Sequence, residues 1–307
     1  MHNSQKTEQL RTCFACASPN LGVLSGVRDA HAGTARNYTL DVCASCGSTK
    51  MREQLSENEL RRIYPDDYYS YVTSDPRRSL ARLVLGALYH RHRYIPCFTS
   101  LLEVGCGRGE FLAKIKNKGN VLGLERSSSA SKAAAALGIE VVVGDVENAA
   151  TFAPASFDCI YSNHAFEHLA DPEAALASME RWIKEEGELF IGIPNIKGVV
   201  ARLFGRNWYY IGPPLHVTNS TPKGMTSILA RHGFEIEKIE YNSDPLSIAM
   251  SVYFSLSGRA DNVGAVAKIA IGLASIVLYP LSKLLDAIHC GDCIEVHARK
   301  RRPQAPV

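Results

Sequence analysis

The sequence has no strong excess of one charge, no leader-like start and no long uncharged apolar run. A formal net charge of +3 over 307 residues makes no general case for nucleic acid as a partner. The first residues, MHNSQKTEQLRT, are polar and contain no apolar core, so we expect no signal peptide. No segment reaches the roughly 18 uncharged apolar residues of a membrane span. We therefore expect a globular protein of the cytoplasm.

The nine cysteines are an odd number, which fits a reducing compartment better than a disulfide framework. Four of them form two CxxC pairs, Cys13 with Cys16 and Cys43 with Cys46. Four thiolates from two such pairs match a tetrahedral structural Zn²⁺ site. We expect a zinc-ribbon-like module over residues 1–50, since a module with so few large apolar side chains needs a staple. The alternatives are a degenerate site without metal and a redox pair.

Residues 99–240 alternate between strand-like and helix-like patterns. Helix starts are marked by Ser127 before an alanine-rich run, and by Asp171 and Thr221, each followed by proline. The apolar runs that we expect to form strands are 101–104, 121–124, 139–143, 157–161, 188–193, 234–241 and 294–299. This order predicts an α/β fold: a Rossmann-like, seven-stranded, mostly parallel sheet with helices on both faces. Ligands of such sheets bind at the carboxyl ends of the strands.

The first of these strands runs into a glycine turn, LLEVGCGRGEFL, with Gly105, Gly107 and Gly109 at alternate positions. Glycine permits a positive φ and lets a ligand approach the backbone closely. The turn does not match the dinucleotide fingerprint, because its third glycine comes one residue early and Glu110 stands in the expected place. It also lacks the lysine of a P-loop. Taken alone, the turn leaves open the alternative of a tight strand-to-helix turn that binds no ligand.

Acidic residues at two later strand ends favour an adenosine-bearing ligand. Glu125 ends the second strand, where a carboxylate can accept hydrogen bonds from both hydroxyls of a ribose. Asp145 follows the third strand, where a carboxylate could accept a hydrogen bond from an adenine amino group. The fourth strand ends at the polar segment YSNHAFEHL. One adenosine-bearing ligand would satisfy all three positions.

Five successive segments, LLEVGCGRGEFL, GLERS, GDVE, FDCIYSNHAFEHLADP and GELFIGIPN, resemble the motifs of class I S-adenosylmethionine-dependent methyltransferases. The resemblance covers about residues 99–240. It implies that the three glycines let the backbone pass under the methionine and ribose of S-adenosylmethionine, and that Glu125 binds the ribose hydroxyls. The other cofactor-binding residues that it implies are Glu103 near the amino-acid end, Asp145 and Val146 at the adenine, and Asn163 and His164 beside the methionine.

Three histidines are candidates for catalysis, because a neutral-pH general base helps when the methyl acceptor is a hydroxyl. They are His164, His168 and His216. The segment around His216, RLFGRNWYYIGPPLHVTNSTP, resembles methyltransferases of bacterial surface-polysaccharide and glycan clusters. That resemblance implies a sugar or glycan acceptor and acceptor-facing roles for Trp208 and Tyr209. We expect the acceptor to be a small molecule or a lipid-linked glycan. The alternatives are a capping or packing role for His168 and a packed structural loop around His216.

The remaining segments frame the expected methyltransferase domain, residues 99–300. Residues 51–98 read as a helical linker or lid, and 301–307 as a disordered tail. Residues 241–290 form an apolar helical insertion before the last strand. Three interpretations of this insertion stay open: it covers the acceptor pocket, it docks on the inner face of the membrane through residues 246–285, or it packs on its own core or on a second copy. The alternative for the whole chain is a catalytically inactive binding or scaffold protein with this fold.

Overall fold

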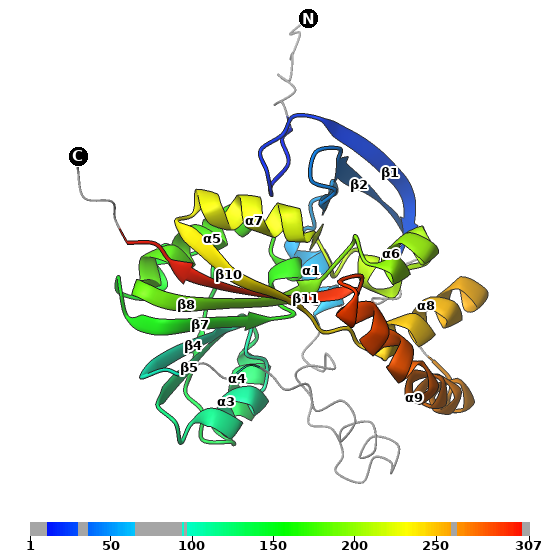
Figure 1. Ribbon diagram of the computed structural model, residues 1–307. Helices are drawn as coiled ribbons and strands as arrows, with labels where there is room; N and C mark the ends of the chain where they lie inside the picture. The colour runs from blue at the N-terminus through cyan, green and yellow to red at the C-terminus, as the bar shows by residue number, and fades with distance from the viewer. Residues whose placement is uncertain (1–10, 30–35, 65–93, 95–96, 259–262, 303–307) are drawn as a thin grey trace, which may run out of the picture.

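The computed structural model describes residues 11–29, 36–64, 94, 97–258 and 263–302, which form two sheets with helices around them (Figure 1). The smaller sheet has the order β1-β2-β3-β9 and the larger one has the order β10-β11-β8-β7-β4-β5-β6. The strands of the smaller sheet are β1 (Leu21–Arg28), β2 (Asn37–Cys43), β3 (Thr49–Met51) and β9 (Thr218–Asn219). Those of the larger sheet are β4 (Ser100–Val104), β5 (Asn120–Glu125), β6 (Val141–Val143), β7 (Phe157–Asn163), β8 (Ile183–Pro194), β10 (Phe234–Tyr241) and β11 (Cys293–Lys300).

The larger sheet confirms the predicted seven-stranded, mostly parallel architecture. Strands β4 to β8 pair in parallel, whereas β11 runs antiparallel to both of its neighbours, β8 and β10. Each predicted strand overlaps an observed one, although β8 begins five residues earlier than the apolar run at 188–193. Because β4 lies between β5 and β7, the chain reverses its winding at the carboxyl ends of β4 and β7. In doubly wound sheets this switch point is the place where ligands bind.

The helices flank this sheet as their capping residues predict. Helices α3 (Glu110–Ile115) and α4 (Ser128–Ala135) lie on one face, and α5 (Pro172–Trp182) and α7 (Pro222–Arg231) lie on the other (Figure 1). Asp171 accepts a hydrogen bond from Ala174 N and so begins α5, and Thr221 caps α7 in the same way. At the end of α5, Trp182 is fully buried and donates from Nε1 to the carbonyl of Ala149 at 2.9 Å.

The N-terminal module is joined to the methyltransferase-like part through its third strand. β3 pairs antiparallel with β9, which belongs to the segment that follows His216. The Thr221 hydroxyl donates to the carbonyl of Cys46 at 2.9 Å, and Arg231 donates to the carbonyls of Phe14 and Ala15. The module therefore docks on the start and end of α7, so it shares its sheet and its core with the rest of the chain.

Between residues 51 and 98 the structure describes helix α1 (Glu57–Ile63), which begins with a capping box of Ser56 and Glu59. Residues 65–93, which hold the segment PDDYYSY and the basic run after it, lie outside the described residues, as do 303–307. The interpretation of this region as a lid stays a prediction.

The apolar insertion forms α8 (Pro245–Ser257) and α9 (Ala265–Ala287). α8 contacts α6 (Val199–Phe204) and the short 3-10 turns η3 (Gly205–Asn207) and η4 (Tyr209–Ile211). By length and composition, α9 is the one helix among the described residues that could cross a membrane. The expectation that no uncharged apolar run reaches about 18 residues holds for α9, which attains its length because the helix continues through Lys268 and Lys283 at the two ends of that run.

The entry to β4 depends on one carboxylate at the start of β7. Asp158 accepts hydrogen bonds from the backbone N–H groups of Thr99 and Ser100 at 3.1 and 3.0 Å. Burial raises the pKa of Asp158, but the hydrogen bonds from Thr99 and Ser100 outweigh it, so the net pKa is lowered. A lowered folded-state pKa means that this stabilisation is present above the unfolded-state pKa of about 3.9 and is lost as pH falls through the folded-state value.

We predict that Asp158→Asn lowers the free energy of unfolding by about 1–2 kcal/mol at pH 7, because a neutral amide replaces a charged acceptor. The deficit should begin to shrink as pH falls below the unfolded-state pKa of about 3.9, and it should disappear only below the lowered pKa of the folded state. Urea denaturation at pH 7 and pH 3.5 measures both effects. Glu140→Gln, at an exposed position before β6, is the matched control. Equal stability of the Asp158 variant and the wild type at pH 7 would contradict this account.

Candidate functional site

The turn after β4 can be made only with glycine at its key positions. Gly105, Gly107 and Gly109 have φ values of +72°, +52° and +68°, in the left-handed region that favours glycine. A Cβ on Gly105 would also lie 2.4 Å from the Cβ of Ala165, just beyond the end of β7. The turn therefore passes tightly against the end of β7, at the switch point of the sheet.

Glu125, the last residue of β5, is bonded to this turn. Its buried carboxylate accepts from Gly107 N at 2.9 Å and from Ser127 N at 3.1 Å. A carboxylate offers about four acceptor positions, so two more hydrogen bonds can be accepted there. This capacity fits the two hydroxyls of a ribose, and the bond to Gly107 fixes where they would lie relative to the turn.

The carboxylate of Asp145 is less available to an adenine amino group than the sequence suggests, because it already has two partners. Its Oδ2 forms an ion pair with Arg126 at 2.9 Å, and its Oδ1 accepts from Glu147 N at 3.0 Å. The next residue, Val146, is buried in the core and can present an apolar contact. An adenine amino group that approached Asp145 would thus share its carboxylate with Arg126.

Glu103 and Cys106 lie buried beneath the turn. Burial, together with the negative charges of Glu103 and Glu125, raises the pKa of the Cys106 thiol. A Cβ on Gly123 would meet the Cys106 sulfur at 2.4 Å, so the thiol fills space against β5. Cys106 is therefore a neutral packing residue and not a nucleophile.

The end of β7 carries Asn163 and His164, followed by the 3-10 turn η2 (Phe166–His168). His164 has a positive φ of +52° and its Nδ1 lies 3.1 Å from Oε1 of Glu167. Glu167 is almost fully buried. Burial raises its pKa, but His164 and the nearby rings of His168 and His216 outweigh burial and lower the pKa to about 2. The residue is thus an anion in a buried site.

Glu167 was not among the predicted site residues, although it stands directly before a predicted histidine in the segment FEHL. A carboxyl in a turn flanked by apolar residues was the available signal. The structure brings all three predicted histidines around it. His168 and His216 lie with ring centroids 4.9 Å apart, and His164 contacts Glu167 directly.

The expectation that Trp208 faces the acceptor is wrong. Trp208 is fully buried in the core beneath α6 and α8, and its Nε1 lies 3.4 Å from Oδ2 of Asp292. Tyr209 is half-buried, and its backbone N–H donates to the hydroxyl of Ser251 on α8 at 2.9 Å. These contacts hold the segment before His216 on the insertion and bury the ring of Trp208.

The four predicted zinc ligands come together. The sulfurs of Cys13 and Cys46 are 3.6 Å apart and those of Cys16 and Cys43 are 3.5 Å apart. All four lie within 4.8 Å of one another. Thiolates around one zinc ion are about 3.8 Å apart, whereas a disulfide would bring two sulfurs to about 2 Å. The arrangement therefore fits a tetrahedral metal site.

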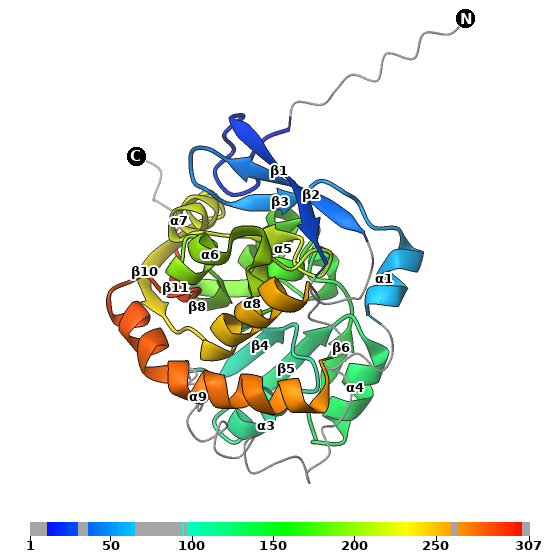
Figure 2. The same cartoon turned by 90° about the vertical axis from the view of Figure 1, so that its right-hand side faces the viewer.

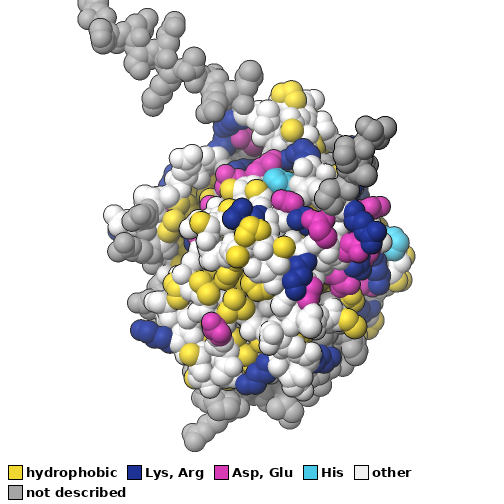
Figure 3. Space-filling model, turned by 90° about the vertical axis from the view of Figure 1, so that its left-hand side faces the viewer, with side chains coloured by type: hydrophobic (Ala, Val, Ile, Leu, Met, Phe, Trp, Pro, Cys, Tyr) yellow, Lys and Arg dark blue, Asp and Glu magenta, His cyan; other side chains and the backbone are white. Residues whose placement is uncertain are grey.

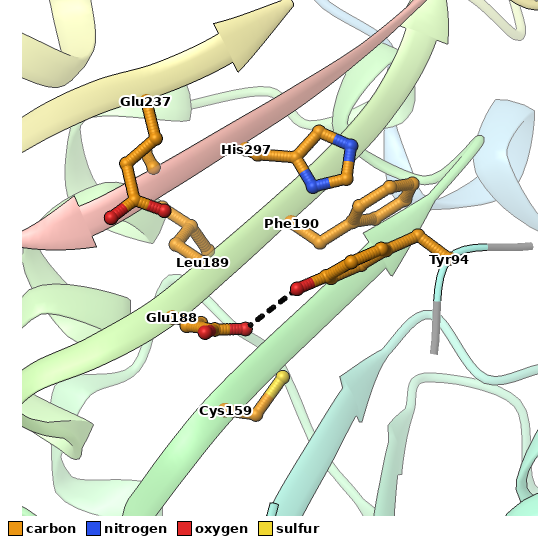
Figure 4. Close-up of a pocket in the computed structure, with 8 residues that line it drawn as sticks. Tyr94, Cys159, Glu188, Leu189, Phe190, Glu237 and His297 are labelled. Carbon is orange, nitrogen blue, oxygen red and sulfur yellow. Dashed lines mark hydrogen bonds between the residues drawn. The ribbon is translucent and has the colours of Figure 1, made fainter. Parts of the chain in front are cut away.

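One small hollow lies away from these groups, over the middle of β8 and β11 (Figure 4). Tyr94 covers it and donates to Oε2 of Glu188 at 3.2 Å. Burial and the charge of Glu188 raise the pKa of Tyr94 to about 12. Since it is remote from the strand ends that carry the glycine turn, we regard this hollow as a packing gap of the sheet.

Comparison with known proteins agrees with this geometry. Residues 102–191 match the family model of a methyltransferase domain. Among curated proteins, the chain is 28% identical over 138 residues to trans-aconitate 2-methyltransferase of Deinococcus radiodurans, covering 42% of this chain and 48% of that protein. It is 26% identical over 193 residues to an uncharacterized 37.1 kDa protein in transposon TN4556 of Streptomyces fradiae, covering 59% of this chain and 51% of that one. The chain thus spans about half the length of these relatives.

Among solved structures, the [4+2]-cyclase SpnF aligns with a TM-score of 0.50 at 18% identity, over 81% of this chain and 97% of that chain. This likeness concerns the fold. Together with the family match, it identifies the seven-stranded sheet and its helices as a Rossmann-like methyltransferase fold.

Proposed function

We propose that the protein transfers a methyl group from S-adenosylmethionine, in the cytoplasm, to a sugar or glycan intermediate that is either a small molecule or a lipid-linked glycan. The observation that carries the proposal is the bond between Gly107 N and the buried Glu125 carboxylate, on the same sheet edge as the cluster of Glu167 and the three histidines. The methyltransferase-domain match over residues 102–191 supports the donor. The sugar acceptor rests on the resemblance of the segment around His216 alone.

The donor supplies a methyl carbon that its sulfonium already activates, so the protein has mainly to align the acceptor with it. The glycine turn would lie under the methionine and ribose, and Glu125 would accept from the ribose hydroxyls. Asn163 and His164 would lie beside the methionine. The three histidines would then face the acceptor, where one can hold or receive the proton of a hydroxyl.

The catalytically inactive scaffold remains the second candidate. The similarity to a protein that is named a cyclase, at a TM-score of 0.50, shows that this fold alone does not establish methyl transfer. The two candidates differ in a simple way, because only the enzyme must bind the donor and release a methyl group.

We predict that the protein binds S-adenosylmethionine in isothermal calorimetry and that Glu125→Ala weakens this binding about 10- to 100-fold. The reason is the loss of hydrogen bonds to a charged acceptor, worth about 1.5–3 kcal/mol. Glu110→Ala, on the exposed start of α3, is the matched control and should leave the affinity within about twofold. A labelled-methyl assay on cell extracts, fractionated into lipid-linked glycans, nucleotide sugars and small metabolites, then tests the acceptor.

Absence of donor binding in the wild type would remove the proposal. Donor binding without transfer to any fraction would favour the scaffold.

We also propose that Cys13, Cys16, Cys43 and Cys46 bind one structural Zn²⁺. Burial raises the pKa of the Cys13 thiol, and a cation among the sulfurs would offset the cost of forming buried thiolates. Because the module docks on α7 and pairs through β3 with β9, the ion would also hold the segment next to His216.

Cys46→Ser should therefore reduce the zinc content measured by atomic emission and lower the melting temperature by several degrees. Cys97→Ser changes an exposed cysteine outside the cluster and should alter neither quantity. If the purified wild type carries no zinc and gains no thermal stability when zinc is added, the degenerate-site alternative is correct.

A further inference from the structure

The side chains of Glu167, His168 and His216 form a cluster whose geometry goes beyond a pair of hydrogen-bonded histidines. One carboxylate oxygen and one ring nitrogen from each histidine lie within 4.8 Å of one another. Ligand atoms about 2.1 Å from a shared ion lie about 3–3.5 Å apart, so small side-chain movements would bring these three atoms to a common centre. Glu167 and His216 are buried, and His168 is half-buried.

Both histidines are oriented by backbone carbonyls. Nδ1 of His168 lies 2.9 Å from the carbonyl oxygen of Leu215, and Nδ1 of His216 lies 2.7 Å from that of Tyr210. Nδ1 of His168 also lies 3.1 Å from the hydroxyl of Tyr64, which can accept from the same N–H group. Because a carbonyl only accepts, a proton on each Nδ1 satisfies these contacts and leaves Nε2 as the electron-pair donor of each neutral ring. This is the arrangement in which metal-binding histidines are held by their surroundings.

The two oxygens of the Glu167 carboxylate also have different surroundings. Oε1 is contacted by His164 Nδ1 at 3.1 Å. Oε2 is buried and has no hydrogen-bond partner within the described part of the chain. A buried anionic oxygen without a donor is costly, and a bound cation is one way in which proteins satisfy it.

We propose that Glu167, His168 and His216 bind a divalent first-row transition-metal ion at the acceptor side of the proposed donor site. Two imidazoles and one carboxylate suit Zn²⁺, Fe²⁺, Co²⁺ or Mn²⁺ and leave coordination positions for an oxygen of the acceptor. The binding of the ion is independent of the proposed methyl transfer, whereas its catalytic role rests on that function.

In that role the ion binds the acceptor hydroxyl and lowers the pKa of its proton, which is released to solvent. The oxygen then forms a bond to the methyl carbon as the bond from that carbon to the sulfonium sulfur breaks. The electron pair goes to sulfur, which leaves neutral S-adenosylhomocysteine.

The test is metal binding by the full-length protein with its cysteine cluster loaded with zinc. After dialysis, Mn²⁺ and Co²⁺ are titrated separately, followed by electron paramagnetic resonance for Mn²⁺ and absorption for Co²⁺. The wild type should bind one of these ions per chain, and Glu167→Gln and His216→Ala should each weaken that binding at least about tenfold. His289→Ala, at an exposed histidine after α9, is the control and should bind as the wild type does.

Folding of each variant is checked by circular dichroism, and His168→Ala supplies a third variant if one of the others does not fold. Equal binding by wild type, Glu167→Gln and His216→Ala would overturn the proposal, as would the absence of binding by the wild type. If the ion binds in this pattern and no methyl transfer is detected, the result supports the metal site and contradicts the proposed function.

A second observation concerns the outer surface of α9, which lies across the face of the molecule shown in Figure 2. Seven aliphatic residues on it are exposed and recur every three or four positions, so they form one stripe along the whole helix. They are Val266, Ile269, Leu273, Val277, Leu281, Leu284 and Ile288. The opposite side of α9 packs inward through Ile271, Ser275 and Asp286. The stripe is therefore an outward face of a helix that is already held by the protein.

The exposed charge on this helix is positive. Among the described residues of α9, Lys268 is exposed, Lys283 is half-buried and forms an ion pair with Asp286, and Asp286 is buried and accepts from Ser243 N. On the side of the molecule opposite to that in Figure 2, acidic and basic side chains are interspersed (Figure 3). An apolar stripe whose helix exposes a cation and, among its described residues, no anion is complementary to an anionic lipid surface.

We infer that α9 lies flat on a bilayer that contains anionic lipids, with the stripe in the acyl boundary. Because Ile271, Ser275 and Asp286 pack against the protein, and Asp286 accepts from Ser243 N, a spanning orientation would require α9 to leave its place in the fold. This placement would bring the acceptor segment, which packs on α8, close to the membrane surface.

Vesicle co-sedimentation tests it. The wild type should bind vesicles of phosphatidylglycerol and phosphatidylcholine more tightly than vesicles of phosphatidylcholine alone, and Val277→Asp should weaken binding at least about tenfold. Val23→Asp, at an exposed apolar residue of β1, is the control. A protein that binds neither vesicle, and that is a dimer which Val277→Asp converts to a monomer, would show that a second copy covers the stripe.

Discussion

The backbone of Val217 is the connection on which the rest of the candidate site depends. Its carbonyl accepts from Met51 N at 2.8 Å, and its N–H donates to the carbonyl of Glu167 at 2.9 Å. One residue therefore ties the N-terminal module to the turn at the end of β7. Since His216 is its direct neighbour, the position of that histidine relative to Glu167 is set by two backbone bonds and not by side-chain packing alone. The cysteine cluster can thus influence the site without touching it.

Two buried carboxylates, those of Glu125 and Glu167, lie at the edge of the larger sheet where the parallel strands end. Glu125 is held by the backbone N–H groups of Gly107 in the glycine turn and of Ser127 after β5, which makes it a rigid acceptor suited to hydroxyl groups. Glu167 is surrounded by imidazoles, which keep it ionised in a site where burial alone would neutralise it. The environments differ because Glu125 ends a central strand, whereas Glu167 lies in a turn that meets β9. Recognition of the donor and activation of the acceptor can therefore be separate properties of neighbouring elements.

The sequence was sufficient for the parts of the fold in which local signals agree. Asp171 and Thr221 capped the helices they were expected to begin, and the glycine turn with Glu125 came together at the predicted strand ends. The packing between segments that are distant in the sequence could not be predicted from such local signals. Nothing in the segment around Trp208 distinguishes an acceptor-facing ring from one that bonds to Asp292, 84 residues later. Glu167 was missed because its importance comes from His216, which the fold brings in from a distant segment.

A crystal structure with bound S-adenosylhomocysteine tests the central claim most directly. The account predicts that both ribose hydroxyls lie within hydrogen-bond distance of the Glu125 carboxylate, that the backbone of Gly105 to Gly109 contacts the ribose and the amino-acid part, and that the sulfur faces the side of Glu167 and His216. Ligand density at any other place on the protein, or a ribose that does not contact Glu125, would contradict it.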